Sequence, residues 1–113
     1  MSARIIGLGE TVMDILFKEI KDDNAATSEY VPFAAVPGGS TFNSMVSVGR
    51  SGIPCKFMGY TGNNKVGHQI VDFMVLNGIS TEYFQIRENE RAAISLAYLD
   101  SNGDADYTFY KEE

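Results

Sequence analysis

The chain of 113 residues is long enough for one domain with a hydrophobic core, and its composition, 44% hydrophobic and 21% charged, is that of a globular protein. Its formal net charge of −6 argues against nucleic acid as a partner, because no cluster of Lys or Arg offsets the acidic excess. The single cysteine, Cys55, excludes an intramolecular disulfide and fits a reducing cytosol. No apolar run approaches the ~18 residues that span a bilayer. We therefore expect a soluble, cytoplasmic protein that does not contact membranes.

Two extended segments begin the chain. Residues 4–10 have the apolar character and terminal glycines of a short buried strand, and residues 11–17 form a second extended run. The pair Gly7-x-Gly9 is not a dinucleotide-binding fingerprint, because the third glycine of that pattern is missing. Asp14 stands among apolar neighbours, where a carboxylate needs hydrogen-bond partners. Two sugar hydroxyls would supply such partners, or Asp14 would cap a nearby turn, and the residues alone leave both interpretations open.

A polar, turn-rich stretch over residues 18–30 predicts a loop or hairpin tip facing water. The next segment, residues 31–36, has extended character. Pro32 places this strand at the edge of a sheet, because proline cannot donate a hydrogen bond to a neighbouring strand.

The run Pro37-Gly38-Gly39-Ser40-Thr41-Phe42-Asn43 is the stretch around which the chain is organised. Apolar and small residues recur after it at helical spacing, which predicts a helix to about Ser51. Consecutive glycines let the backbone approach a ligand closely, and the amides of a helix start attract hydroxyl or phosphate oxygens. We expect the hydroxyl of Ser40 or Thr41 to cap this helix, and the side chain of Asn43 to point toward the same corner. The combination suits a polyhydroxylated ligand.

A second strand and helix follow. Residues 55–59 form a compact strand in which we expect Cys55 to be a small buried hydrophobe rather than a nucleophile, because no pattern of nearby basic residues argues for an activated thiol. The turn at residues 61–64 starts a helix over roughly residues 65–77. His68 lies on this helix, and we expect it at the surface rather than in a metal site, because no further ligands stand at suitable spacing.

The last third of the chain is rich in β-structure. Residues 79–86 predict a connecting strand or loop, and a charged turn follows at residues 87–91. Two β-rich runs, residues 93–99 and 107–110, are separated by an Asn102-Gly103 pair that favours a hairpin. The whole pattern predicts an α/β protein: a parallel sheet with flanking helices, plus a small projecting β-sheet. Phe33, Tyr98 and Phe109 give the projecting sheet apolar aromatic faces. We expect these faces to be covered by other protein surface.

The motif Gly38-Gly39-Ser40-x-x-Asn43, followed by glycines at positions 49, 52, 59 and 62, resembles the N-terminal signature of the ribokinase-like (PfkB) carbohydrate kinases. The resemblance covers the whole chain and implies the N-terminal portion of a ribokinase-like fold. It divides this part of a single kinase domain into core βα units and lid strands. The core units are about residues 3–14 and 37–86, and the lid strands are about residues 15–36 and 91–111.

The resemblance also implies an activity, the transfer of the γ-phosphate of MgATP to a primary sugar hydroxyl. The catalytic Gly-Ala-Gly-Asp motif of the family does not occur in these 113 residues. ATP and Mg²⁺ would therefore be bound mainly by a C-terminal part, and the fragment alone would be inactive. In this family the lid often packs against its twin, which implies a homodimer.

Individual residues acquire roles from the same resemblance. Four of them match sugar-binding positions of the family: Asp14, Gly38, Gly39 and Asn43. Ser95 and Phe109 match lid positions that close over the sugar ring. Asn64 stands where the family usually has an aspartate, and its amide can still cap the following helix.

Fructokinase is the specificity that the resemblance favours. Gly9-Glu10 before Asp14 and the ending Phe109-Tyr110-Lys111 are similar to fructokinase-type members, although Lys111 stands where those members commonly have arginine. Two other interpretations remain: a non-catalytic sugar-binding module, and a structural unit that dimerises through its β-sheet. A reading frame that continues past Glu113 into a Gly-Ala-Gly-Asp segment would weaken both.

Overall fold

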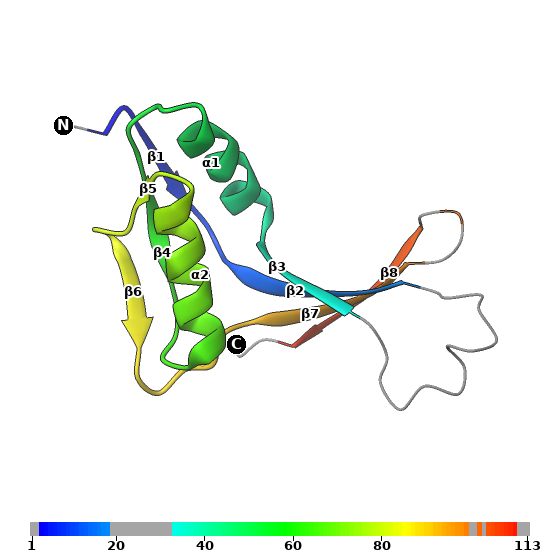
Figure 1. Ribbon diagram of the computed structural model, residues 1–113. Coiled ribbons are helices and arrows are strands. Elements are labelled where there is room, and N and C mark those ends of the chain that lie inside the picture. The colour runs from blue at the N-terminus through cyan, green and yellow to red at the C-terminus, as the bar shows by residue number, and fades with distance from the viewer. Residues whose placement is uncertain (1–2, 19–32, 100–101, 103, 111–113) are drawn as a thin grey trace.

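Two β-sheets joined at one corner make up the computed structural model, which describes residues 3–18, 33–99, 102 and 104–110 (Figure 1). The described residues form the following elements, in chain order: β1 (Ile5–Leu8), β2 (Val12–Lys18), β3 (Phe33–Gly38), α1 (Ser40–Arg50), β4 (Cys55–Gly62), α2 (Lys65–Leu76), β5 (Ile79–Ser80), β6 (Phe84–Arg87), β7 (Ile94–Leu99) and β8 (Ala105–Tyr110). None of these helices is long and apolar enough to cross a membrane.

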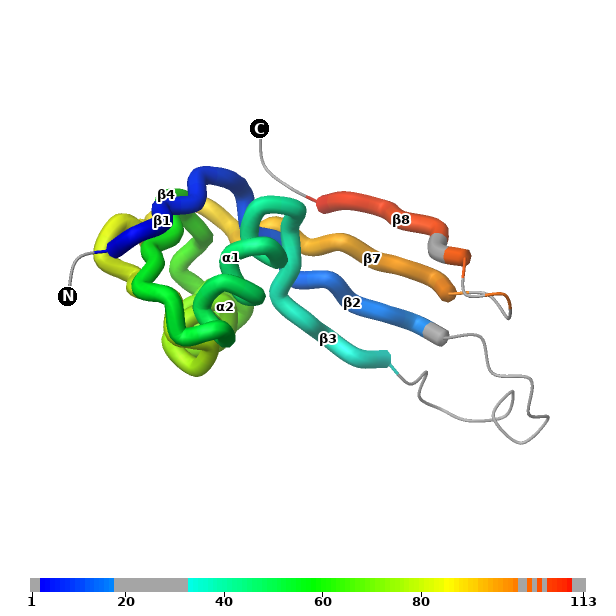
Figure 2. Tube along the Cα trace, turned by 90° about the horizontal axis from the view of Figure 1, so that it is seen from above, coloured from blue at the N-terminus to red at the C-terminus, as the bar shows by residue number. Residues whose placement is uncertain are grey.

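The first sheet is parallel throughout, as predicted. Strand β1 pairs with the first half of β4, and β5 and β6 pair with successive parts of the opposite edge of β4. Both helices lie against one face of this sheet (Figures 1 and 2). The β–α–β connections thus follow the pattern expected of parallel strands, with each helix crossing over between neighbouring strands.

The hydrophobic core lies between this sheet and its two helices. Helix α1 buries Phe42, Met45, Val46 and Gly49, and α2 buries Gly67, Ile70 and Met74, at the helical spacing seen in the sequence. The Phe42 ring packs edge-on against Phe57 of β4, with ring centroids 5.4 Å apart. Cys55 is buried in the same core, as expected of a small hydrophobe, and this burial raises the pKa of its thiol.

The second sheet, called the projecting sheet below, extends away from the first (Figure 2). Its strand order is β3-β2-β7-β8. Strand β2 is antiparallel to β3 and parallel to β7, and β7 forms the predicted antiparallel hairpin with β8. Strand β3 is at an edge, as the proline before it predicted, although Pro32 itself and the loop of residues 18–30, apart from Lys18, lie outside the described residues.

Some expected boundaries are wrong, for identifiable reasons. The first lid segment is expected to begin at about residue 15 and to end at about residue 36. Strand β2 instead joins the projecting sheet from Val12 onward, and β3 runs to Gly38, because these two residues pair with one another. Residues 61 and 62 belong to β4 rather than to a turn, because β6 continues the pairing there. Strand β1 is not buried: Leu8 is 70% exposed, since the helices cover the other face of the sheet.

The predicted start of α2 is correct. Asn64 is the residue before the first turn, and its side-chain oxygen accepts a hydrogen bond from the N–H of Gly67 at 2.8 Å. An asparagine is therefore a competent cap at this position, as expected.

Candidate functional site

Asp14 lies in the middle of β2, within a row of side chains that crosses the projecting sheet. It pairs with Val36 of β3 on one side and with Ser95 of β7 on the other, and Ser95 pairs in turn with Phe109 of β8. Directly paired residues share one face of a sheet, so these four side chains point the same way. The position of Asp14 in a strand removes the alternative in which it caps a turn.

The carboxylate of Asp14 has one partner within the described chain. The hydroxyl of Ser95, which is completely buried, donates to Oδ1 of Asp14 at 2.6 Å. Asp14 itself is half-buried, so part of the carboxylate faces outward. Ser95 thus touches Asp14 rather than standing exposed over a ligand site.

The two adjacent glycines have different structural roles. Gly38 lies beside the Asp14 carboxylate, and a Cβ added there would overlap Oδ2 of Asp14. Gly39 has φ of 123°, a conformation that residues with a side chain rarely adopt, and a Cβ there would lie 2.5 Å from the backbone oxygen of Glu10. Gly38 therefore makes room for the Asp14 carboxylate, and Gly39 makes the turn into α1 possible.

The amino end of α1 has no side-chain cap. Gly39 is the capping residue and Ser40 is already the first residue of the helix, so the prediction that Ser40 or Thr41 caps it is wrong. The first-turn amides of a helix have no intrahelical acceptor, and they carry the positive end of the helix dipole. This helix start is therefore suited to oxygen atoms of a ligand.

A pocket of about 270 Å³ lies at this helix start. Its lining residues come from the link between β1 and β2, the first residue of β2, the start of α1, and the strands β7 and β8 with the residue before β7: Glu10, Thr11, Val12, Gly39, Ser40, Ala93, Ile94 and Phe109. The pocket is at the carboxyl end of β1, the end of a parallel sheet at which ligands characteristically bind. It is close to the lower limit of typical small-molecule sites, about 300 Å³.

The structure brings together five of the six predicted site residues. Asp14, Gly38 and Ser95 are in contact, and Gly39 and Phe109 line the adjoining pocket. Asn43 does not line it. It lies one turn into α1 with an exposed side chain, and its backbone N–H donates to the Gly39 oxygen at 2.8 Å. Its role remains a prediction.

Thr11 is a pocket residue that the sequence did not single out. It is only 5% exposed, and its hydroxyl has no hydrogen-bond partner within the described part of the chain. A threonine beside an apolar run gives no signal of this kind, because the same residue type is common in ordinary strands.

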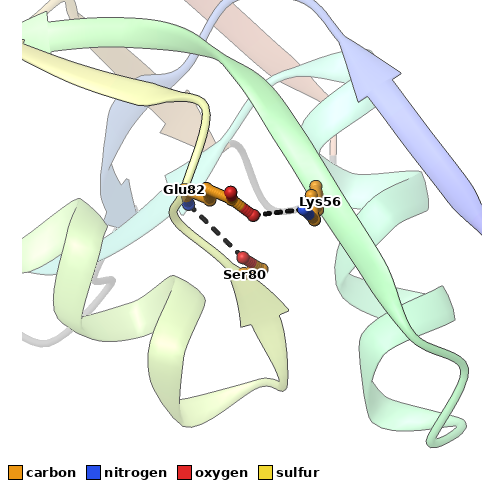
Figure 3. A network of polar contacts seen from close by, with 3 residues as sticks. All are labelled: Lys56, Ser80 and Glu82. Atoms are coloured by element: carbon orange, nitrogen blue, oxygen red, sulfur yellow. Dashed lines mark hydrogen bonds and ion pairs between the residues drawn. The ribbon is translucent and has the colours of Figure 1, made fainter. Parts of the chain in front are cut away.

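A second hollow, of about 520 Å³, lies at the opposite end of the parallel sheet, beside Pro54. Here the Lys56 ammonium is paired with the carboxylate of Glu82, whose backbone N–H donates to the Ser80 hydroxyl at 3.3 Å (Figure 3). The hydrogen bond to Glu82 raises the pKa of Lys56. Because this charge is already neutralised and the hollow is at the amino ends of the strands, we interpret the network as structural.

The described residues do not assemble a metal site. No three side chains of the His, Cys, Asp or Glu type lie together in the described ranges. His68 is exposed, with its Nε2 atom 2.7 Å from the side-chain oxygen of Asn63, which agrees with the expected surface position.

A parallel sheet with helices on one face and a separate projecting sheet define an α/β protein, with a carboxylate beside a glycine-bounded helix start where the two sheets meet. The chain belongs to the pfkB family of carbohydrate kinases, whose family model matches residues 2–113.

Its similar curated relatives include fructokinases from plants. Over 109 residues the chain is 29% identical to fructokinase-2 of Oryza sativa subsp. japonica, a match that covers 95% of this chain and 31% of the relative. It is 26% identical to fructokinase-2 of Solanum lycopersicum over 110 residues, covering 97% of this chain and 33% of that protein. The chain thus spans about a third of the length of the curated relatives it matches.

Solved structures share the fold. The fructokinase of Xylella fastidiosa with bound ATP superposes with a TM-score of 0.81 at 23% identity, covering 95% of this chain and 32% of that one. The ribokinase of Cryptococcus neoformans in complex with ADP gives a TM-score of 0.76 at 18% identity, covering 97% and 34%. The fold is therefore ribokinase-like, as the sequence predicted.

Proposed function

We propose that this chain is the acceptor-binding and lid portion of an ATP-dependent sugar kinase that transfers the γ-phosphate of ATP to a sugar hydroxyl, with fructose as the acceptor. The single observation that carries the proposal is the Asp14 carboxylate, held by Ser95 beside Gly38 and next to the uncapped start of α1. The carboxylate can accept a hydrogen bond from a sugar hydroxyl, and the helix-start amides can donate one to a hydroxyl oxygen. Together they satisfy both the donor and the acceptor capacity of sugar hydroxyls.

In this proposal the projecting sheet is the lid. Phe109 lines the pocket from β8 and supplies an apolar surface for the carbon face of the sugar ring. Asn43 would contribute a group that both donates and accepts. Closure of the lid over the sugar would exclude water that could otherwise hydrolyse ATP, and would fix the acceptor hydroxyl for attack.

The remaining parts of the reaction are assigned to polypeptide beyond these 113 residues. Phosphoryl transfer needs a nucleotide site, a cation that neutralises phosphate charge, and a base near the attacking hydroxyl. The described residues do not provide a fitting Mg²⁺ site, and the family's Gly-Ala-Gly-Asp motif does not occur in the sequence. We therefore assign MgATP binding and the catalytic aspartate to the rest of the kinase, and we regard the isolated chain as inactive. We also propose that the kinase is cytoplasmic.

The acceptor is tested by comparing sugars. The complete kinase, incubated with ATP and fructose, ribose or ketodeoxygluconate, is expected to release ADP with the highest kcat/KM for fructose. Two sequence features that resemble fructokinases support the choice of fructose: Gly9-Glu10 before Asp14, and the ending Phe109-Tyr110-Lys111. The plant fructokinases among the relatives support it as well. A higher kcat/KM for ribose would overturn the choice of sugar. Sugar binding by calorimetry without any ADP release would favour a non-catalytic binding module instead.

We also propose that the lid pairs with the lid of a second copy. Phe33 and Tyr98 are 62% and 53% exposed, and both rings pack against Phe17, at centroid distances of 5.8 and 5.0 Å. This cluster is on the face of the sheet opposite to Asp14, because Asp14 and Phe17 are three positions apart in β2 and Phe33 and Tyr98 pair directly with Phe17. A second copy would cover the cluster and leave the ligand face open.

The dimer is tested by sedimentation velocity on the complete kinase. We expect a dimer for the native protein and a monomer for Tyr98→Lys, because a charge would be buried in the proposed interface. The exposed position Gln69 on α2 offers a control, Gln69→Lys, that should remain dimeric. A native protein that sediments as a monomer at micromolar concentration would contradict the proposal and also exclude the purely structural dimerisation unit.

A further inference from the structure

We infer that Ser95 is a positioning residue for the acceptor site: its hydroxyl holds the Asp14 carboxylate in the one orientation that presents the remaining oxygen to the sugar. This inference rests on the proposed function and deepens it. The family resemblance placed Ser95 over the sugar ring, whereas the structure places its hydroxyl against Asp14.

The hydrogen bond between Ser95 and Asp14 is short, and its donor is buried. The Oγ–Oδ1 distance of 2.6 Å falls within the range of charge-assisted O–H···O⁻ bonds, about 2.5–2.7 Å. Ser95 is completely buried, so no bulk water competes for its one proton. The Ser95 hydroxyl therefore donates its hydrogen bond to Oδ1 of Asp14 rather than to bulk water.

The backbone fixes both partners of this bond. Ser95 and Asp14 are directly paired residues of the parallel strands β7 and β2. Strand pairs above and below them, such as Met13 with Ile94 and Ile15 with Leu96, hold the same register. The donor cannot shift along the sheet without breaking that register, so the Ser95 hydroxyl stays opposite the Asp14 carboxylate.

The other carboxylate oxygen is bounded by Gly38. A Cβ at that position would overlap Oδ2, so the carboxylate occupies space that only glycine leaves open. Oδ1 thus accepts the hydrogen bond from Ser95, and Oδ2 lies beside the Gly38 backbone, which carries no side chain. A carboxylate has about four acceptor positions, and the Ser95 bond uses one of them. The remaining positions can accept from two ligand hydroxyls without any reorientation of the side chain, which lowers the entropic cost of binding.

The test is a set of variants of the complete kinase. For Ser95→Ala we expect the KM for the sugar to rise about tenfold, the fold-change for one charge-assisted hydrogen bond, while the KM for ATP is unchanged and kcat changes less than about threefold. Ser95→Cys keeps the side-chain size with a weaker donor and should give an intermediate KM. The matched control is Thr61→Val, which removes another buried hydroxyl, 3% exposed and without a partner within the described residues. It should leave both KM values as they are.

A double-mutant cycle with Asp14→Asn separates the possible failures. If Ser95 acts through Asp14, adding Ser95→Ala to Asp14→Asn should raise the sugar KM less than about twofold further. If Asp14→Asn alone leaves the sugar KM unchanged, the proposed function itself fails. If Asp14→Asn raises the KM but Ser95→Ala behaves like Thr61→Val, or if the two effects are fully additive, the positioning role is overturned.

Discussion

Replacing Asp14 with alanine in the complete kinase is expected to raise the KM for the acceptor sugar on the order of a hundredfold or more, or to abolish turnover. Hydrogen bonds to a charged group are each worth about 1.5–3 kcal/mol, and every 1.4 kcal/mol is about tenfold in affinity, so the loss of two sugar contacts accounts for this range. The variant also leaves the buried Ser95 hydroxyl without its acceptor. Steady-state kinetics with varied sugar at saturating ATP measures the effect.

The control for this variant is Asp72→Ala, which removes an acid from the exposed face of α2. It changes the net charge by the same amount without touching the site, so its kinetics should match those of the native enzyme. Native kinetics for Asp14→Ala with every sugar tested would remove Asp14 from the acceptor site.

Gly39→Ala is expected to destabilise the protein by about 3 kcal/mol or more and to weaken sugar binding as well. A residue with a side chain in a conformation that belongs almost only to glycine costs about 1–3 kcal/mol, and here φ is 123°. The added Cβ would in addition lie 2.5 Å from the Glu10 backbone oxygen, which cannot move without displacing the segment that lines the pocket. Thermal unfolding, followed by calorimetry, measures the loss.

Gly52→Ala is the matched control for Gly39→Ala. Gly52 also has a positive φ, 81°, but an added Cβ would meet no atom within 4 Å. It therefore isolates the conformational strain from the close approach, and we expect a loss of about 1 kcal/mol. Equal losses for the two variants would show that the contact with Glu10 contributes nothing.

The elements that the sequence predicted well are those with a strong local pattern. The apolar spacing of Phe42, Met45 and Val46 defined α1, and the asparagine at position 64 correctly predicted the start of α2. The β7–β8 hairpin also followed from two β-rich runs around a turn pair. In each case the information lies within about a dozen residues.

The features that the sequence could not predict depend on contacts between distant residues. Asp14 and Ser95 are 81 positions apart, and only the parallel pairing of β2 with β7 brings them together. No local pattern predicts which oxygen Ser95 binds, or that Gly38 is needed for its space rather than for its φ. The exposure of β1 follows from the number of helices that cover the sheet, which is likewise a property of the assembled fold.

The proposed acceptor site depends on the Asp14 carboxylate and the amino end of α1 binding the same sugar. A crystal structure of the complete kinase with its acceptor tests this most directly. We predict sugar hydroxyl oxygens about 2.5–3.0 Å from the Asp14 carboxylate, with the Ser95 bond retained and the ligand against the Gly39–Ser40 backbone. A carboxylate turned away from the sugar, or a Gly38–Gly39 corner covered by protein in the complex, would contradict the account.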